Sequence, residues 1–179
     1  MLNKKEILFD SSKITLYIDD YTGIFSDFDP RPYSKKALSD DFLLEAKRAA
    51  KERPNEKLEL IFLMHKKKRR SDIETEVKKR LKQHFKKHYL MLGNELKQLK
   101  EKSMIIVFVG FLLMVLATYV TYRDYSNFVF YLLRIVFEPA GWFSVWWGLD
   151  QLFYSSKAKL PDYQFYKKMA KVDIKFMNY

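Results

Sequence analysis

The most apolar part of the chain lies between residues 104 and 154, and its pattern predicts two membrane-spanning helices. Residues 104–122 carry no charge and, at about 19 residues, are long enough to cross a hydrocarbon core about 30 Å thick. A second apolar segment follows over residues 128–154, after a turn of only a few residues. Such a short turn predicts an antiparallel hairpin.

The second apolar segment contains Pro139 directly after Glu138. Proline disfavours helical geometry in the residue before it and fits best in the first turn of a helix. We therefore expect a break at residues 138–141, which would leave a short interfacial or re-entrant piece over residues 128–137. The second span would then cover residues 139–154.

Before the first span, residues 71–103 predict one long, basic, amphipathic helix. Ser71 and Glu74 have the spacing of a capping box at its start. The apolar positions recur about every 3.7 residues, which is a plain helical face rather than a strict heptad. They are Ile73, Val77, Leu81, Phe85, His88 or Tyr89, Leu92, Leu96 and Leu99. Nothing in the pattern ends this helix before residue 104, so we expect it to run into the membrane.

The first block, residues 1–70, mixes strand and helix signals. Residues 14–19 (ITLYID) and 57–64 (KLELIFLM) are rich in β-branched and aromatic residues and predict strands. Between them, Ser39 is suited to the N-cap of a helix that runs to about Lys51.

The tail, residues 155–179, ends in a further strand signal. Val172, Ile174 and Phe176 alternate with polar residues over the last nine positions, 171–179. Because a lone strand is not stable, we expect this one to return to the N-terminal sheet. The predicted fold class is thus a cytosolic α+β part (strand-helix-strand plus a C-terminal strand) fused through the long basic helix to a two-helix transmembrane hairpin.

Basic residues give the hairpin an orientation. The formal net charge is +11. Lys97, Lys100 and Lys102 flank the first span, and five lysines follow the second, whereas the turn carries only Arg123. The five are Lys157, Lys159, Lys167, Lys168 and Lys171. The positive-inside rule therefore predicts cytoplasmic termini in the cell (inner) membrane.

The densest basic run is HKKKRR at residues 65–70, and it continues along the long helix. The residues suited to contact with an anionic partner are Lys66, Lys67, Lys68, Arg69, Arg70, Lys79, Arg80, Lys86 and Lys87. A solvated helix face explains such a run by itself. Beside a membrane the nearest partner is anionic lipid headgroups, at about 1 kcal/mol per basic residue near the surface. Nucleic acid becomes comparable if the run lies beyond a Debye length of about 8–10 Å.

Three ionisable residues, Arg134, Glu138 and Asp150, fall within the second apolar segment. Arg134 and Glu138 are four apart and share a helix face. Three roles stay open for this pair. At an interface Arg134 would snorkel and Glu138 would cap the helix after Pro139. The two residues would otherwise pair between helices, or face the interior of an oligomer and mark an ion path.

Metal chemistry has only weak candidates. Four carboxylates crowd around the end of the first predicted strand: Asp19, Asp20, Asp27 and Asp29. Carboxylates bind Mg²⁺, but Asp is also favoured in turns and caps. His84 and His88 share a helix face in the geometry of a two-His pair, without a third ligand nearby. The chain has no cysteine, which removes thiol ligands and thiol catalysis, and no cofactor is expected.

Two stretches, SDFDPRPYSKKALSDDFL (residues 26–43) and EPAGWFSVWWGLDQLFY (residues 138–154), resemble a group of small uncharacterised prokaryotic two-span membrane proteins. The resemblance implies the same topology and carries no activity. The leading functional hypothesis is therefore a non-catalytic, membrane-anchored interaction or regulatory module. One alternative is a homo-oligomeric ion channel or pore built from the hairpins. The other is a metal-dependent hydrolase or nuclease that uses the Asp cluster.

Overall fold

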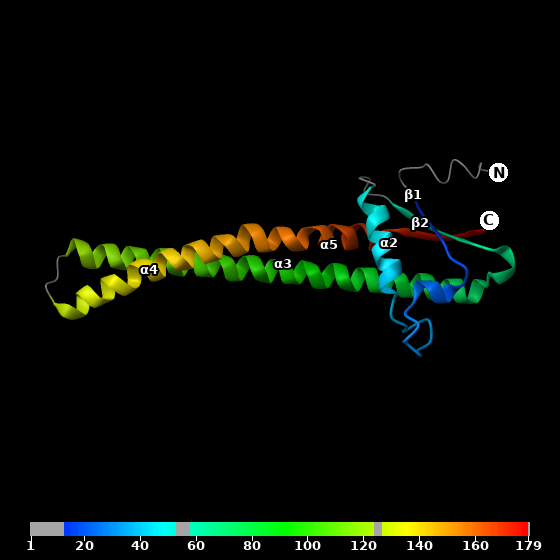
Figure 1. Cartoon of the computed structure of the whole chain (residues 1–179), viewed down its shortest axis with the longest axis horizontal. Coiled ribbons are helices and arrows are strands. Elements are labelled where there is room, and N and C mark those ends of the chain that lie inside the picture. Colours follow the sequence, from blue (N-terminus) through cyan, green and yellow to red (C-terminus); the bar gives the residue numbers. More distant parts are fainter. Residues whose placement is uncertain (1–12, 53–57, 124–126, 179) are drawn as a thin grey trace. The chain divides into compact units, whose positions relative to one another are not determined.

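The computed structural model describes residues 13–52, 58–123 and 127–178 (Figure 1). These residues form two compact units. The first, here called the sheet unit, comprises the described residues of the ranges 1–90 and 162–179, and the second, the hairpin unit, comprises those of the range 91–161. Two helical stretches, Ser71–Tyr122 and Phe128–Met169, are long and apolar enough to cross a membrane.

The sheet unit contains a three-stranded parallel sheet in the order β1-β2-β3, with β1 at Lys13–Tyr17, β2 at Glu59–Met64 and β3 at Asp173–Asn178. The strand predicted at the C-terminus is confirmed, because β3 pairs in parallel with β2. All but the first residue of β2 are buried, as in a central strand covered on both faces. Phe62 of β2 stacks on Phe176 of β3 with ring centroids 5.1 Å apart. The Lys57 end of the predicted second strand lies outside the described residues.

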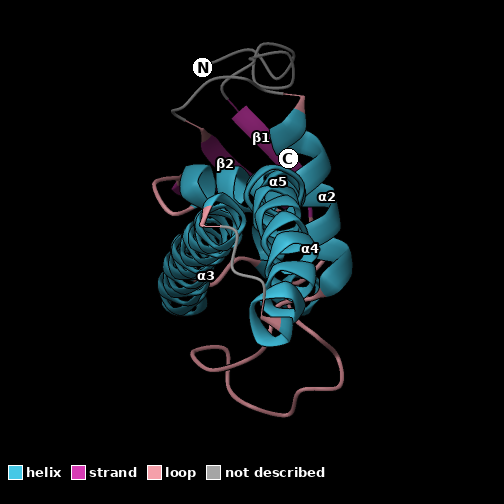
Figure 2. Ribbon diagram, turned by 90° about the vertical axis from the view of Figure 1, so that its left-hand side faces the viewer, coloured by secondary structure: helices cyan, strands magenta, loops and turns pink. Residues whose placement is uncertain are grey.

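Helix α2 (Asp40–Lys51) lies beside β1 and covers the sheet (Figure 2). Its buried residues, Phe42, Ala46 and Ala50, recur every four positions, so one face of the helix packs on the core. Ser39 is the N-cap residue, as predicted. Two short 3₁₀ turns complete this part: η1 (Tyr21–Ile24) after β1 and η2 (Lys66–Lys68) after β2.

Helix α3 (Ser71–Tyr122) is a single helix of 52 residues, which confirms that the basic segment and the first apolar segment are continuous. Within the sheet unit its buried apolar residues are Val77, Leu81 and Phe85. Phe85 meets Phe165 of helix α5 (Ser156–Met169) edge to face, with ring centroids 6.2 Å apart.

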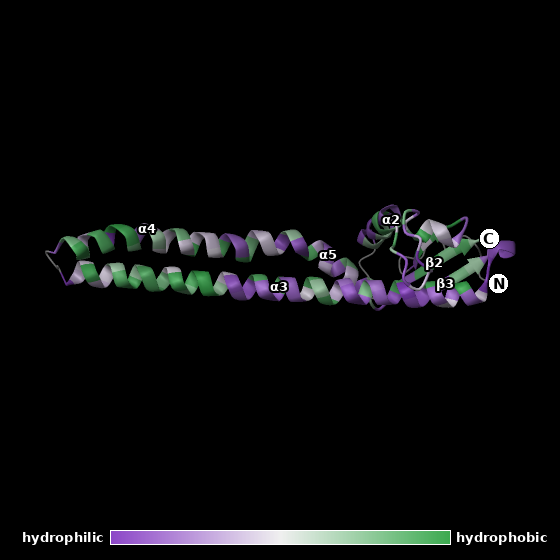
Figure 3. Cartoon of the chain, turned by 90° about the horizontal axis from the view of Figure 1, so that it is seen from below, coloured by the Kyte–Doolittle hydropathy of each residue, from purple (hydrophilic) through white to green (hydrophobic). Residues whose placement is uncertain are grey.

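In the hairpin unit, α3 packs against helix α4 (Phe128–Asp150) through small residues spaced seven apart. Those of α3 are Ser103, Gly110 and Ala117, and those of α4 are Gly141 and Gly148; all are buried. Since these side chains are small, the two backbones approach closely along a seam. Figure 3 shows hydrophobic residues along α4 and along the part of α3 beside it.

The break expected at residues 138–141 is not present, and this expectation is corrected. Pro139 lies inside α4, which runs unbroken from Phe128 to Asp150. It then continues through a π-helical turn, Gln151–Ser155, into α5. Proline removes one helical hydrogen bond, but helices in an apolar environment tolerate it because neighbouring groups satisfy the freed carbonyl. The tail expected from residue 155 is consequently helical until Met169.

Candidate functional site

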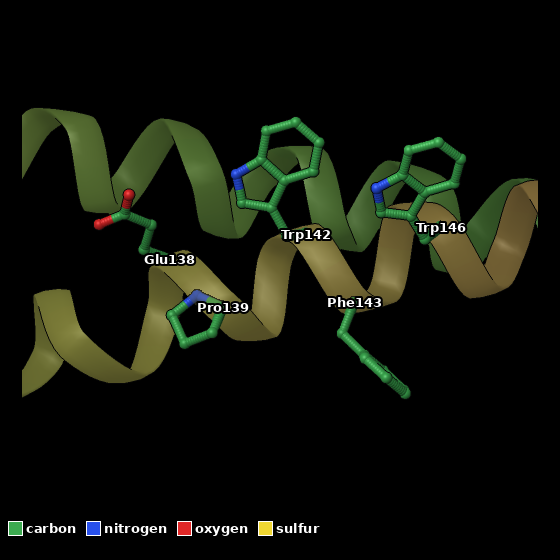
Figure 4. A pocket seen from close by; sticks show the side chains of 5 residues that line it. All are labelled: Glu138, Pro139, Trp142, Phe143 and Trp146. Atoms are coloured by element: carbon green, nitrogen blue, oxygen red, sulfur yellow. The ribbon is translucent and has the colours of Figure 1, made fainter.

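Glu138 lies near the middle of α4 and its side chain is exposed. It lines a shallow hollow of about 640 Å³ together with Pro139, Trp142, Phe143 and Trp146. Glu138, Trp142 and Trp146 point to one side of α4, whereas Phe143 points to the other (Figure 4). Residues spaced four apart lie one above the next on a helix, so this face combines one carboxylate with two indole rings.

A second hollow of about 390 Å³ opens between α3 and α4. Its lining is Met114, Ala117, Thr118, Thr121, Tyr122, Arg134, Glu138 and Trp142. Arg134 and Glu138 therefore face the same space, as their four-residue spacing predicted. No ion pair joins them within the described part of the chain. Within one chain the two side chains thus share this space without an ion pair between them.

The two threonines of this second hollow were not identified from the sequence. The Thr118 hydroxyl donates to the Met114 carbonyl at 2.8 Å, and the Thr121 hydroxyl donates to the Ala117 carbonyl at 2.9 Å. These bonds satisfy the hydroxyl protons inside an apolar helix. Each hydroxyl oxygen keeps acceptor capacity, and both threonines line the hollow. The signal for them was two threonines three apart near the end of an otherwise apolar run.

The third ionisable residue, Asp150, is exposed at the C-terminal end of α4. It is twelve positions from Glu138 and borders the π-helical turn Gln151–Ser155. Asp150 lines neither of the two hollows described above. The structure therefore brings Arg134 and Glu138 together and leaves Asp150 apart from them.

The basic residues divide into two groups. The arginines are held by internal bonds: Arg69 by Glu74 at 2.7 Å, Arg70 by Asp72 at 3.0 Å, and Arg80 by the Lys36 carbonyl at 2.9 Å. The lysines of the set are exposed, namely Lys66, Lys67, Lys68, Lys79, Lys86 and Lys87. A contact with an anionic partner would therefore depend on the lysines.

Glu74 was expected to close a capping box with Ser71, but the structure gives it another role. Its side chain accepts from Arg69 Nε and Nη2, at 2.7 and 3.0 Å, and from the Tyr21 hydroxyl at 3.3 Å. Arg69 also donates to Asn178 Oδ1 at 2.8 Å. This network ties η1, the start of α3 and the end of β3 together, and burial raises the pKa of the Tyr21 hydroxyl.

Two of the four Asp residues serve turns. Asp20 accepts from the Tyr21 amide at 2.6 Å and caps η1. Asp29 accepts from Arg31 at 2.7 Å and from the Ala37 amide at 2.6 Å. The Arg31 guanidinium holds the pKa of the Asp29 carboxyl well below its usual range. The remaining two, Asp19 and Asp27, are exposed.

His84 and His88 lie together on α3, with ring centroids 4.2 Å apart. His88 stacks on Tyr166 of α5 at 5.1 Å, and His84 Nε2 is buried without a hydrogen-bond partner. Burial lowers the pKa of His84 to about 4, so this ring is neutral at pH 7. Among the described residues, no three His, Asp or Glu side chains come together as metal ligands. The geometry is that of two aromatic rings at the edge of a core.

No known protein family, curated protein or solved structure matches the chain. The similarity of residues 26–43 and 138–154 to small two-span membrane proteins therefore stays an expectation. Any functional assignment rests on the residues of the chain itself.

Proposed function

We propose that this protein is a homo-oligomeric membrane protein whose hairpins surround a pathway for cations, lined by Glu138. One observation carries the proposal. Glu138 is an exposed carboxylate near the middle of an unbroken apolar helix, and its own chain provides no ion-pair partner among the described residues. Intramembrane ionisable residues of this kind face an oligomer interior or a water-filled cavity.

The position of Glu138 along α4 argues against an interfacial role. It follows Phe128 by ten residues, which corresponds to about 15 Å of helix at ~1.5 Å per residue. That is close to half of a hydrocarbon core about 30 Å thick. Because α4 does not begin at Pro139, Glu138 has no helix start to cap. A charged side chain facing lipid at a helix centre costs about 2.5–3.5 kcal/mol or more.

In the proposed oligomer, a second copy of the chain covers this carboxylate, which a single hairpin leaves exposed. Within one hairpin, α3 and α4 touch along the seam of small residues, and Glu138 stays outside that seam. Two helices in direct contact do not enclose a channel. Soluble and membrane oligomers are most often closed and symmetric, and rings of Asp or Glu side chains attract cations in pores.

The expected orientation completes the proposal. The lysines before the first span and after the second favour cytoplasmic termini, so the sheet unit would lie on the cytoplasmic side of the inner membrane. Its exposed lysines, Lys66, Lys67, Lys68, Lys79, Lys86 and Lys87, would then meet anionic headgroups or another polyanion of that compartment. No enzymatic step is assigned, since Asp20 and Asp29 are engaged in turns.

Mass and flux measurements on the purified full-length chain test the proposal. The mass of the protein in detergent, corrected for bound detergent, should be two or more times the chain mass of 21.6 kDa. Liposomes that contain the protein should release K⁺ down its gradient, and empty liposomes prepared in parallel should not. A monomeric mass without flux would leave a membrane-anchored interaction module in place of the channel.

A further inference from the structure

We propose that Arg134 determines how the pathway discriminates between monovalent and divalent cations, by offsetting the charge of Glu138. This inference rests on the proposed function. Arg134 precedes Glu138 by one helical turn, and both line the hollow of about 390 Å³ between α3 and α4. Residues four apart on a helix have Cβ atoms about 5–6 Å apart. A cation beside Glu138 therefore occupies the same hollow as the Arg134 side chain.

The guanidinium is a permanent charge, because arginine is not deprotonated in proteins. Arg134 forms no ion pair with any described acidic residue, so no neighbour within its own chain neutralises it. Coulomb repulsion scales with the charge of the permeating ion, so Arg134 disfavours a divalent cation twice as strongly as a monovalent one. Arg134 therefore reduces the attraction of Glu138 for a divalent cation by more than that for a monovalent cation.

The rest of the second hollow suits weakly bound monovalent cations. Thr118 and Thr121 line it, and their hydroxyl protons already bond to the carbonyls of Met114 and Ala117. Neutral oxygens coordinate a cation without adding negative charge, in contrast to the additional carboxylates of tight divalent sites. The opposite charges of Arg134 and Glu138 are therefore the main determinant of how strongly the hollow attracts a cation.

The test measures the permeability ratio of Ca²⁺ to K⁺ from reversal potentials of the full-length protein in planar bilayers. Arg134→Gln should raise the ratio by about tenfold or more, since a unit charge at this distance is only partly screened. Arg134→Lys keeps the charge and should keep the parent ratio. Detergent mass of each variant checks that it still assembles.

A cysteine variant makes the test independent of assembly. The natural chain contains no cysteine, so Arg134→Cys introduces a single thiol that is modified after reconstitution. A methanethiosulfonate reagent that carries an ammonium group should restore the parent ratio, and one that carries a sulfonate should raise it further. A thiol that does not react, or a ratio that is the same for all variants and reagents, would overturn the role of Arg134. If the parent itself does not conduct, the proposed function falls as well.

Discussion

A Cβ atom on Gly110 would lie 2.8 Å from the carbonyl oxygen of Gly141, so α3 and α4 touch there through their backbones. Gly110→Ala should force the helices apart and destabilise the hairpin unit by about 1–3 kcal/mol, the usual cost of overpacking. The three tryptophans of the chain all lie on α4, so the thermal transition of their fluorescence in detergent reports on this unit. Gly23→Ala is the control, because a Cβ at Gly23 meets nothing within 4 Å. Equal transitions for both variants would contradict the close contact.

The Arg69–Glu74 pair should be important for the stability of the sheet unit. Glu74 is 8% exposed, so Arg69→Ala would leave a buried carboxylate without its main partner. We expect a loss of about 1–3 kcal/mol in the free energy of unfolding, measured by denaturant titration with circular dichroism. Arg70→Ala is the matched control, because its pair with Asp72 is exposed and is worth at most about 1 kcal/mol. A larger loss for Arg70→Ala than for Arg69→Ala would refute this network.

The C-terminal strand should be required by the sheet unit. Deletion of residues 171–179 removes β3 and with it the Phe62–Phe176 stack and the pairing of one edge of β2. The buried apolar side chains of β2 would then be uncovered, so limited proteolysis should cut the sheet unit faster than in the parent. Unchanged protease resistance and an unchanged melting temperature would show that β3 is dispensable.

The stability of the sheet unit should fall in acid because of His84. Burial lowers the pKa of His84 from 6.5 to about 4, so the unfolded chain binds more protons between these values. The stabilising contribution of neutral His84 is therefore present above pH 6.5 and is lost as the pH falls toward about 4. His84→Phe should reduce the loss in denaturant midpoint between about pH 7 and about pH 5. The exposed neighbour Gln83, changed to Ala, should leave that loss as in the parent; an equal effect of both variants would contradict the role of burial.

Periodicity was sufficient to predict most elements of the fold. Alternation in residues 14–19 and 171–179 located two strands, and the helical spacing of apolar residues located α3. The N-cap residue Ser39 located α2. The break at Pro139 was wrong because the rule for proline describes a helix in isolation. In the structure, α4 is held against α3 at Gly141, two residues later, and this packing outweighs one lost hydrogen bond.

Only some residues of the candidate site could be predicted from the sequence. Arg134 and Glu138 stood out as charges in an apolar segment, and their spacing placed them on one face. The partners of Glu74 depend on how the turn after β2 places Arg69 beside α3, which no local pattern encodes. Thr118 and Thr121 were missed because threonine is common in apolar helices, where its hydroxyl bonds to the preceding turn.

The most direct measurement is the ion selectivity of the reconstituted full-length protein with and without the carboxylate at position 138. Under a KCl gradient, the parent should give a reversal potential close to that of K⁺, because Glu138 attracts cations. Glu138→Gln leaves the Arg134 charge unopposed and should shift the reversal potential toward that of Cl⁻, whereas the control Glu101→Gln, outside both hollows, should not. A parent that does not conduct, or a Glu138→Gln variant with the parent's reversal potential, would contradict a cation pathway lined by Glu138.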